Sequence, residues 1–395
     1  MKRILIVNNN MHIGGVQKAL VSLLQELRTD YDITLLLFYC GGELCGELPE
    51  GNQLLSPSGA FRCWGMSKSD VTSLSDCLLR AFWAGLTRVF GRPFSVRLAS
   101  AFQKRLGDFD VAISYLHSGP NHMFYGGCNE FVLNCVNASQ KLTFLHCDYK
   151  AIKAGSRYNE EIYRRFDGIV ACSEGCKRSF LSIVPQFSEK TVVVPNFQDY
   201  GAIQQKARLQ PVSFDNDRLN ILTVARFGRE KGILRALRAV AKLGQRRSGI
   251  RYYIIGNGTE YAEAKKSILD LDLGDTVFLL GEMSNPYGYI QGADVLLIPS
   301  FSEAAPLVIR EAACLGTPVL TTETSSAVEM VQATGWGWVC PNTQDGITQG
   351  IQQLLDSPQE LQKRQKTLCD TVFDNSEARR KFSELINGHE KGDGT

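Results

Sequence analysis

The stretch Asp294-Val-Leu-Leu-Ile-Pro-Ser-Phe-Ser-Glu-Ala-Ala-Pro-Leu-Val-Ile-Arg-Glu311 decides the fold of this chain. It begins with an unbroken apolar run, which is typical of a strand buried on both faces of a parallel sheet. A short helix is predicted next and ends near Gly316, and Pro318-Val-Leu-Thr-Thr322 predicts another strand. Strand, helix and strand in this order indicate an α/β sheet, which binds ligands at the carboxyl ends of its strands.

Two glutamates of this stretch, Glu303 and Glu311, lie eight residues apart and bracket the start of the predicted helix. Such a pair can act as acid and base or bind sugar hydroxyls, although a glutamate at a helix start also simply suits the helix dipole. Glu311 stands in an otherwise apolar helix, where an unpaired carboxylate is costly. Pro306 fits the first helical position, and we expect the amides of Leu307 and Val308 to meet an anion.

The same alternation of strands and helices runs through both halves of the chain, and a polar link without a clear period is predicted over residues 199–217. Repeated strand–helix units predict two doubly wound α/β domains with parallel sheets. We place these domains at residues 1–198 and 199–373. We expect residues 374–395 to form a helix that returns to the first domain.

Size and composition limit the classes of protein to which this chain can belong. A chain of 395 residues, with 44% hydrophobic and 21% charged residues, is typical of a soluble globular protein with more than one domain. The net charge of +2 argues against a nucleic-acid-binding protein. The 12 cysteines include no Cys-x-x-Cys pair, which favours buried thiols in a reducing compartment over a zinc site. No apolar run approaches the ~18 residues of a spanning helix, so we expect a cytoplasmic protein, free or peripheral to a membrane.

Residues 76–106 interrupt the alternation, because they mix many apolar side chains with an excess of positive charge. A single acid, Asp76, stands against six basic residues: Arg80, Arg88, Arg92, Arg97, Lys104 and Arg105. A basic amphipathic helix with aromatic residues can lie on an anionic lipid surface. A helical pair that packs on the sheet with a solvated basic face explains the pattern equally well.

Two other segments could bind phosphate at strand ends. Gly14-Gly15 separates the first strand from the first helix and would allow close approach to a phosphate or sugar, although a bare turn explains it as well. Val224-Ala-Arg-Phe-Gly-Arg-Glu-Lys-Gly232 places Arg226 just after a strand and Lys231 just before a helix. Two cations over one loop suit a diphosphate, while the alternative is an ordinary solvated loop.

Among the histidines, His146 stands out because it follows the predicted strand Lys141-Leu-Thr-Phe-Leu145 and should lie at the carboxyl edge of the sheet. A single loop histidine is more often inert than functional.

Taken together, these motifs resemble the retaining glycosyltransferases of family 4, which use nucleotide sugars and have the two-Rossmann-domain fold called GT-B, with the domains facing a central cleft. The similar segments are Asn10-Met-His-Ile-Gly-Gly-Val-Gln17, residues 224–232, Gly256-Asn-Gly258, and residues 303–311 with Gly316-Thr-Pro-Val319. The resemblance spans most of the chain. One departure is that Ala304 and Ala305 stand where the family usually has glycine and a large residue, which leaves the donor sugar open.

The resemblance implies roles for the candidate residues. Arg226 and Lys231 would hold the diphosphate and stabilise the leaving nucleotide without a metal or other cofactor. Glu303 would bind hydroxyls of the donor sugar, Glu311 would bind the ribose, and His146 would lie near the donor sugar. The remaining donor-binding residues that it implies are Gly14, Gly15, Gly256, Gly258, Leu307 and Val308.

The implied activity is transfer of a hexose, with retained anomeric configuration, from a UDP-sugar to a growing cell-surface glycan. The context resembles bacterial capsule, exopolysaccharide or O-antigen transferases, whose acceptors are often lipid-linked at the inner face of the membrane. Two alternatives remain open: a sugar-nucleotide epimerase of the same fold, and a non-catalytic protein that binds glycans or an active transferase.

Overall fold

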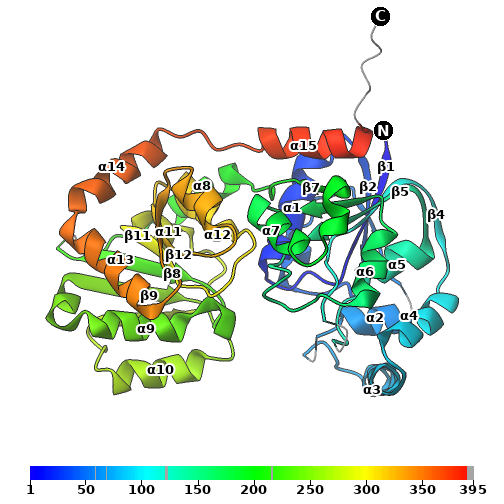
Figure 1. Ribbon diagram of the computed structural model, residues 1–395, viewed down its shortest axis with the longest axis horizontal. Coiled ribbons are helices and arrows are strands. Elements are labelled where there is room, and N and C mark those ends of the chain that lie inside the picture. The colour runs from blue at the N-terminus through cyan, green and yellow to red at the C-terminus, as the bar shows by residue number, and fades with distance from the viewer. Residues whose placement is uncertain (58, 68, 121–122, 215–216, 389–395) are drawn as a thin grey trace, which may run out of the picture. The chain divides into compact units, whose positions relative to one another are not determined.

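The computed structural model describes residues 1–57, 59–67, 69–120, 123–214 and 217–388 (Figure 1). They form two compact units. Unit 1 contains residues 1–198 and the segment that begins at Asn375, and unit 2 contains Asp199–Asp374. Each unit is an α/β layer structure in which the paired strands are parallel. In the described part of the chain, no helix combines the length and the apolar character that crossing a bilayer requires.

The sheet of unit 1 has the strand order β3-β2-β1-β4-β5-β6-β7 among the described residues. Its strands are β1 (Arg3–Asn8), β2 (Asp32–Leu37), β3 (Gln53–Leu55), β4 (Leu106–Ser114), β5 (Val136–Leu145), β6 (Gly168–Ala171) and β7 (Thr191–Val193). Ile4 on β1 pairs with Ile33 on one side and Val111 on the other. The strand order therefore reverses between β1 and β4, which is where doubly wound sheets bind ligands.

Helices cover both faces of this sheet, and each face has its own buried apolar cluster. The helices of unit 1 are α1 (Gly15–Leu27), α2 (Ala60–Gly65), α3 (Leu74–Phe90), α4 (Arg92–Ala101), α5 (Cys128–Cys135), α6 (Arg157–Arg164), α7 (Glu174–Leu181) and α15 (Ser376–Asn387). The segment 76–106 is thus a helix pair followed by the start of β4.

The sheet of unit 2 has the order β10-β9-β8-β11-β12-β13 in the described residues. Its strands are β8 (Leu219–Val224), β9 (Ile250–Ile255), β10 (Val277–Gly281), β11 (Val295–Ile298), β12 (Val319–Thr322) and β13 (Gly337–Cys340). Its helices are α8 (Tyr200–Leu209), α9 (Ile233–Lys242), α10 (Tyr261–Asp270), α11 (Tyr287–Gly292), α12 (Leu307–Cys314), α13 (Gln344–Asp356) and α14 (Pro358–Cys369). Here the order reverses between β8 and β11. The prediction of two doubly wound α/β domains is confirmed.

The prediction of an irregular link over residues 199–217 was wrong, because most of its first half is the helix α8. Asp199 caps this helix by accepting a hydrogen bond from the amide of Ala202 at 2.9 Å. Tyr200, Ile203 and Ala207 are buried at helical spacing. Three apolar positions in ten residues give too weak a period to stand out against polar neighbours, but they suffice once a core is present.

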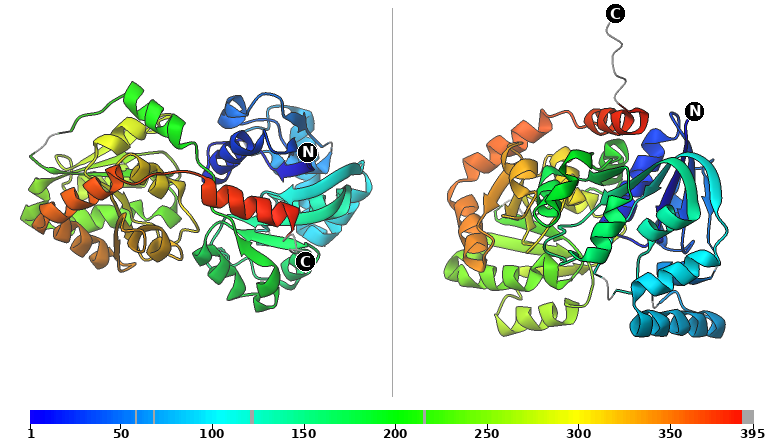
Figure 2. Two further views of the ribbon diagram at one scale, coloured as in Figure 1. Left: turned by 90° about the horizontal axis from the view of Figure 1, so that it is seen from above. Right: turned by 45° about the vertical axis from the view of Figure 1, so that its right-hand side comes forward.

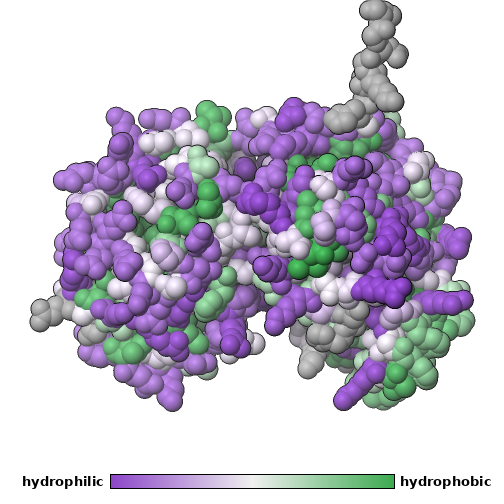
Figure 3. Space-filling model, in the orientation of Figure 1, coloured by the Kyte–Doolittle hydropathy of each residue, from purple (hydrophilic) through white to green (hydrophobic). Residues whose placement is uncertain are grey.

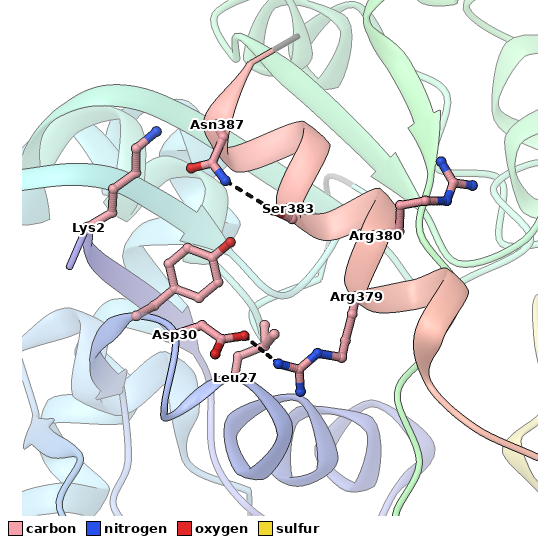
Figure 4. A pocket seen from close by; sticks show the side chains of 8 residues that line it. Lys2, Leu27, Asp30, Arg379, Arg380, Ser383 and Asn387 are labelled. Carbon is pink, nitrogen blue, oxygen red and sulfur yellow. Dashed lines mark hydrogen bonds and ion pairs between the residues drawn. The ribbon is translucent and has the colours of Figure 1, made fainter. Parts of the chain in front are cut away.

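Helix α15 packs on unit 1 although 177 residues separate its preceding residue Asn375 from Gln198, to which Asn375 is hydrogen-bonded. Phe382 is fully buried in the same apolar cluster as α1. Arg379 binds Asp30, just after the end of α1, at 2.6 Å, and the two side chains line a surface hollow with Lys2 (Figure 4). Figure 2 shows α15 in red beside the other elements of unit 1. Because these charges are paired with one another or with backbone, we interpret the hollow as a structural joint.

We expect Phe382→Ala to destabilise unit 1 by about 3–5 kcal/mol, because truncating a buried phenyl ring removes apolar contacts and leaves a cavity. Hydrogen exchange of the β1 and β2 amides in low urea measures the change within unit 1. Val372→Ala is the control, since that side chain is 86% exposed. Unchanged exchange in Phe382→Ala would mean that α15 does not stabilise this core.

Candidate functional site

The candidate donor site lies at the carboxyl edge of the unit 2 sheet, on the loops that follow β8 and β11. These two strands are neighbours, paired through Val295 and Ile221. The helices that follow them, α9 and α12, belong to different apolar clusters, so the two loops lie at the reversal of strand order, where doubly wound sheets bind ligands. The loop after β8 carries Arg226 and Lys231, and the loop after β11 carries Glu303.

Lys231 and Glu303 join the two loops directly. The ammonium nitrogen Nζ of Lys231 lies 2.8 Å from Oε1 of Glu303. The same carboxylate oxygen accepts a hydrogen bond from Oγ of the buried Ser300 at 2.6 Å. The side chains of Lys231 and Glu303 are only 25% and 10% exposed, so this is a partly buried charge pair and its geometry is well defined by its surroundings.

Backbone contacts hold the same loops together. Gly232 has φ +66°, and a Cβ at this position would lie 2.1 Å from the carbonyl oxygen of Pro299. The amide of Phe301 donates to the carbonyl of Glu230 at 2.8 Å. Only a glycine allows the chain to pass so close at position 232, which places Lys231 beside the β11 loop.

Arg235 is a residue of this site that sequence reasoning missed. It lies on α9, is 6% exposed, and donates to the carbonyls of Pro299 at 2.8 Å and Ser300 at 2.7 Å. Its guanidinium carbon is 3.8 Å from the centre of the Phe301 ring. Burial lowers the pKa of Arg235. The sequence of α9 alone does not distinguish this arginine from its basic neighbours, and only the three-dimensional contacts show that it positions the β11 loop.

Arg226 is the most exposed of the candidate cations, with 74% of its side chain accessible. Its Nη2 lies 2.8 Å from Oε1 of Glu230, four residues along the same loop. Burial alone would raise the pKa of Glu230, but backbone hydrogen bonds and Arg226 outweigh it, so the pKa of Glu230 is lowered. Both candidate cations of the loop, Arg226 and Lys231, therefore have a carboxylate partner.

Gly256 and Gly258 follow β9 and pack closely against the backbone of the loop that carries Arg226. Gly256 has φ +141°, and a Cβ there would lie 2.0 Å from the carbonyl oxygen of Ala225. Gly258 has φ +154°, and its Cβ would lie 2.7 Å from the carbonyl oxygen of Phe227. The amide of Phe227 also donates to the carbonyl of Asn257 at 2.9 Å. These two glycines therefore position the loop that carries Arg226.

Helix α12 begins one residue later than the sequence predicts. Pro306 is the residue before the helix, with ψ 121°, and Leu307 and Val308 form its first turn. Glu311 lies on the inner side of this helix, 5% exposed, and its Oε1 accepts from the hydroxyl of Tyr287 at 3.4 Å. Placing Pro306 inside the helix was wrong because its backbone is extended, as expected of a residue at the N-cap position.

Unit 1 holds the remaining candidates. Gly14 has an extended backbone with φ −172°, which any residue adopts, so the predicted tight turn is not present. Gly15 begins α1, and a Cβ there would meet no atom within 4 Å. The neighbouring His12 is held by Asp70 at 2.9 Å and by Glu43 at 3.3 Å. The loop is therefore fixed by side-chain contacts, with open space beside Gly15.

His146 lies just after β5 and packs on Tyr115, with 4.6 Å between the ring centres and the planes tilted by 48°. Burial, together with the neighbouring His117, lowers the pKa of His146 to about 3. Burial also lowers the pKa of His117 to about 4. Both rings are therefore neutral at pH 7. Nε2 of His146 and Nδ1 of His117 are buried without a hydrogen-bond partner among the described residues, so His117 is a second candidate at this sheet edge.

Comparison with known proteins agrees with the geometry of unit 2. Residues 204–367 match the family model "Glycosyl transferases group 1". The chain is 34% identical to the amylovoran biosynthesis glycosyltransferase AmsK of Erwinia amylovora, over 145 residues that cover 35% of each chain. It is 31% identical to the putative colanic acid biosynthesis glycosyltransferase WcaL of Escherichia coli, over 140 residues that cover 33% of this chain and 34% of the relative. These matches thus span about a third of the length of each relative.

Solved structures extend the likeness in fold to both units. HepE of Anabaena, solved in complex with UDP, has a TM-score of 0.67 and 15% identity and covers 98% of this chain and 100% of its own. WaaG, a glycosyltransferase of lipopolysaccharide biosynthesis, has a TM-score of 0.63 and 15% identity, with 98% and 100% covered. The predicted GT-B fold is confirmed, and the match to the group 1 glycosyltransferases covers residues 204–367 of this chain.

Proposed function

We propose that this chain is a retaining hexosyltransferase that moves a hexose from a UDP-sugar to a growing polysaccharide. The observation that carries the proposal is the contact between Lys231 and Glu303 at the reversal point of the unit 2 sheet. This contact joins an ammonium group, which suits a diphosphate, to a carboxylate, which suits sugar hydroxyls, inside the segment that matches the glycosyltransferase family. A donor has its diphosphate and its sugar directly next to each other, so this pairing suits a nucleotide sugar.

The chemistry proposed for the site is electrostatic. Lys231 and Arg226, rather than a metal ion, neutralise the diphosphate as negative charge develops on the leaving nucleotide. The bond between the anomeric carbon and the phosphate oxygen breaks, the acceptor oxygen bonds to the same carbon, and the acceptor proton passes to the leaving phosphate. Glu311 binds the ribose. In unit 1, the neutral ring of His146 can donate or accept a hydrogen bond without adding charge.

The proposal also names the nucleotide of the donor and the kind of acceptor. UDP is supported by the solved structures of HepE and TarM, which contain UDP. We infer that the acceptor is a cell-surface glycan on a lipid carrier; the similarity to AmsK and WcaL, glycosyltransferases of amylovoran and colanic acid biosynthesis, supports a role in glycan assembly. Such a carrier would place the protein at the inner face of the cell membrane.

We expect Lys231→Ala to lower the transfer rate about 100-fold or more, as when one preorganised donor is removed from a transition state. Thermal shift with UDP, GDP, ADP and CMP and their common sugars first identifies the nucleotide, because a ligand of the folded state raises Tm. That shift should vanish in Lys231→Ala and persist in Lys242→Ala, an exposed lysine of α9. A near wild-type rate in a folded Lys231→Ala protein would refute the diphosphate role.

We expect Glu311→Gln to weaken nucleotide binding about tenfold, since a charged hydrogen-bond acceptor contributes about 1.5–3 kcal/mol. Isothermal titration with UDP measures the affinity, and uridine separates the ribose contribution from that of the diphosphate. Glu263→Gln, on the exposed face of α10, is the matched control. Equal affinity in both variants would remove Glu311 from the ribose site.

Acid should destabilise unit 1 through its buried histidines. The unfolded chain takes up protons at His117 and His146 near pH 6.5, while the folded unit resists them down to about pH 4 and 3. Their contribution is therefore complete above pH 6.5 and falls by up to about 1.4 kcal/mol per pH unit for each histidine as the pH drops.

Urea denaturation between pH 7 and 5 tests this dependence, with His146→Gln expected to flatten it. His12→Gln should change it in the opposite direction. Burial alone would lower the pKa of His12, but Asp70 and Glu43 outweigh it, so the pKa of His12 is raised. An unchanged slope in His146→Gln would show that this ring does take up a proton in the folded state.

A further inference from the structure

The helix α3 turns an apolar face outward. Leu74, Leu78, Phe82 and Val89 follow one another at helical spacing and are 76%, 63%, 58% and 73% exposed. The pattern of this helix is that of an ordinary amphipathic helix, yet of its residues only Trp83 is buried. In Figure 3 the surface where Figure 1 places α3 is predominantly hydrophobic. Over most of the helix the apolar residues therefore face outward, whereas the apolar side of an amphipathic helix usually packs on the core.

The inner side of α3 already packs against other residues of unit 1, so the orientation of the helix is fixed. Trp83 packs edge-on against Trp64 of α2, with 6.1 Å between ring centres, and belongs to a buried cluster of unit 1. Arg80 reaches inward and donates to the carbonyls of Cys63 and Met66. These contacts fix the rotation of α3 and with it the outward direction of the apolar residues.

The apolar surface continues from α3 onto α4. The rings of Phe90 and Phe94 lie 5.1 Å apart at the junction of the two helices, and both are about half exposed or more. Phe102, just after α4, is 80% exposed. We call this surface the α3–α4 face; its exposed large apolar residues are Leu74, Leu78, Leu79, Phe82, Val89, Phe90, Phe94 and Phe102.

Positive charge borders the α3–α4 face. The exposed basic residues of the segment are Arg88, Arg97, Lys104 and Arg105. Arg92 is not among them, because its Nε binds Glu130 at 2.7 Å in the interior. Asp76, the acid of this segment, is paired with Arg62 at 2.5 Å. Both Arg80 and Arg92 therefore leave the basic face that the sequence predicted, and four exposed cations remain against no unpaired acid among the described residues 74–106.

Charge decides which partner fits this surface. A second copy of the chain docked face to face would bring two sets of these cations together, which is unfavourable in a desolvated interface. An anionic bilayer suits both features, because apolar and aromatic side chains enter the headgroup boundary while arginine and lysine meet lipid phosphates.

We propose that the α3–α4 face docks on an anionic phospholipid membrane, with α3 lying in the plane of the interface. Leu78, Phe82 and Val89 would enter the lipid, and Arg88 and Arg97 would contact phosphates at the rim. The inference extends the proposed function by bringing unit 1 to the surface where a lipid-linked acceptor resides. It does not require that transfer occurs.

Sedimentation of the full chain with phospholipid vesicles tests the docking. The wild type should bind vesicles that contain phosphatidylglycerol, bind phosphatidylcholine alone weakly, and lose affinity as salt is raised. Leu78→Asp with Phe82→Asp should reduce binding at least tenfold. Leu269→Asp, at an equally exposed leucine of α10, should not. Arg88→Gln with Arg97→Gln should weaken binding about fivefold for each charge removed, whereas Arg28→Gln with Arg208→Gln should leave it unchanged.

The UDP thermal shift is measured on every variant, since it reports unit 2 and stays intact if only the α3–α4 face is altered. Vesicle binding by a chain that binds no nucleotide would support the docking and overturn the proposed transfer. Vesicle binding that survives Leu78→Asp with Phe82→Asp would overturn the docking. A concentration-dependent dimer in light scattering that these substitutions abolish, without vesicle binding, would also overturn it and assign the face to a second copy.

Discussion

The site depends on how closely the loops after β8 and β11 approach each other in unit 2. A parallel sheet brings the two strand ends side by side, but strand pairing alone leaves the following loops free to diverge. Gly232 removes the side chain that would collide with the Pro299 carbonyl, and Arg235 ties that carbonyl and the next to α9. The contact between Lys231 and Glu303 follows from this backbone arrangement, so the chemistry of the site rests on a glycine and a buried arginine that touch no reacting atom.

Much of the fold was predictable because buried parallel strands are continuous apolar runs, and each is followed by a polar or glycine-rich turn. The strand that ends at Ile298 and the loop that carries Glu303 could therefore be placed together at one sheet edge. Short edge strands were missed: β3 has three residues, and β13 holds Gly337 and Trp338 in four. A strand that short shows no period, and its partner across the sheet supplies the information that its sequence lacks.

The direction in which a helix faces is a second limit of sequence reasoning. Periodicity shows that α3 has an apolar side but not which side meets the sheet. In the structure Trp83 marks the inner side, because its ring is buried beside Trp64 while Leu78 and Phe82 turn outward. The same limit applies to charge. The sequence predicts Arg92 on a basic face and says nothing particular of Arg235, whereas each contacts oxygen atoms of residues that lie far away along the chain.

The paired cations of unit 2 have a consequence for the proposed mechanism. Arg226 is held by Glu230 and Lys231 by Glu303, so these two positive charges are already paired with carboxylates of the protein. A diphosphate would replace the two carboxylates as their partner, and binding then exchanges one set of ion pairs for another. The exchange frees Oε1 of Glu303, which remains oriented by Ser300, at the moment when the sugar arrives. In the proposed mechanism the carboxylate that pairs with Lys231 becomes the acceptor for the hydroxyls of the donor.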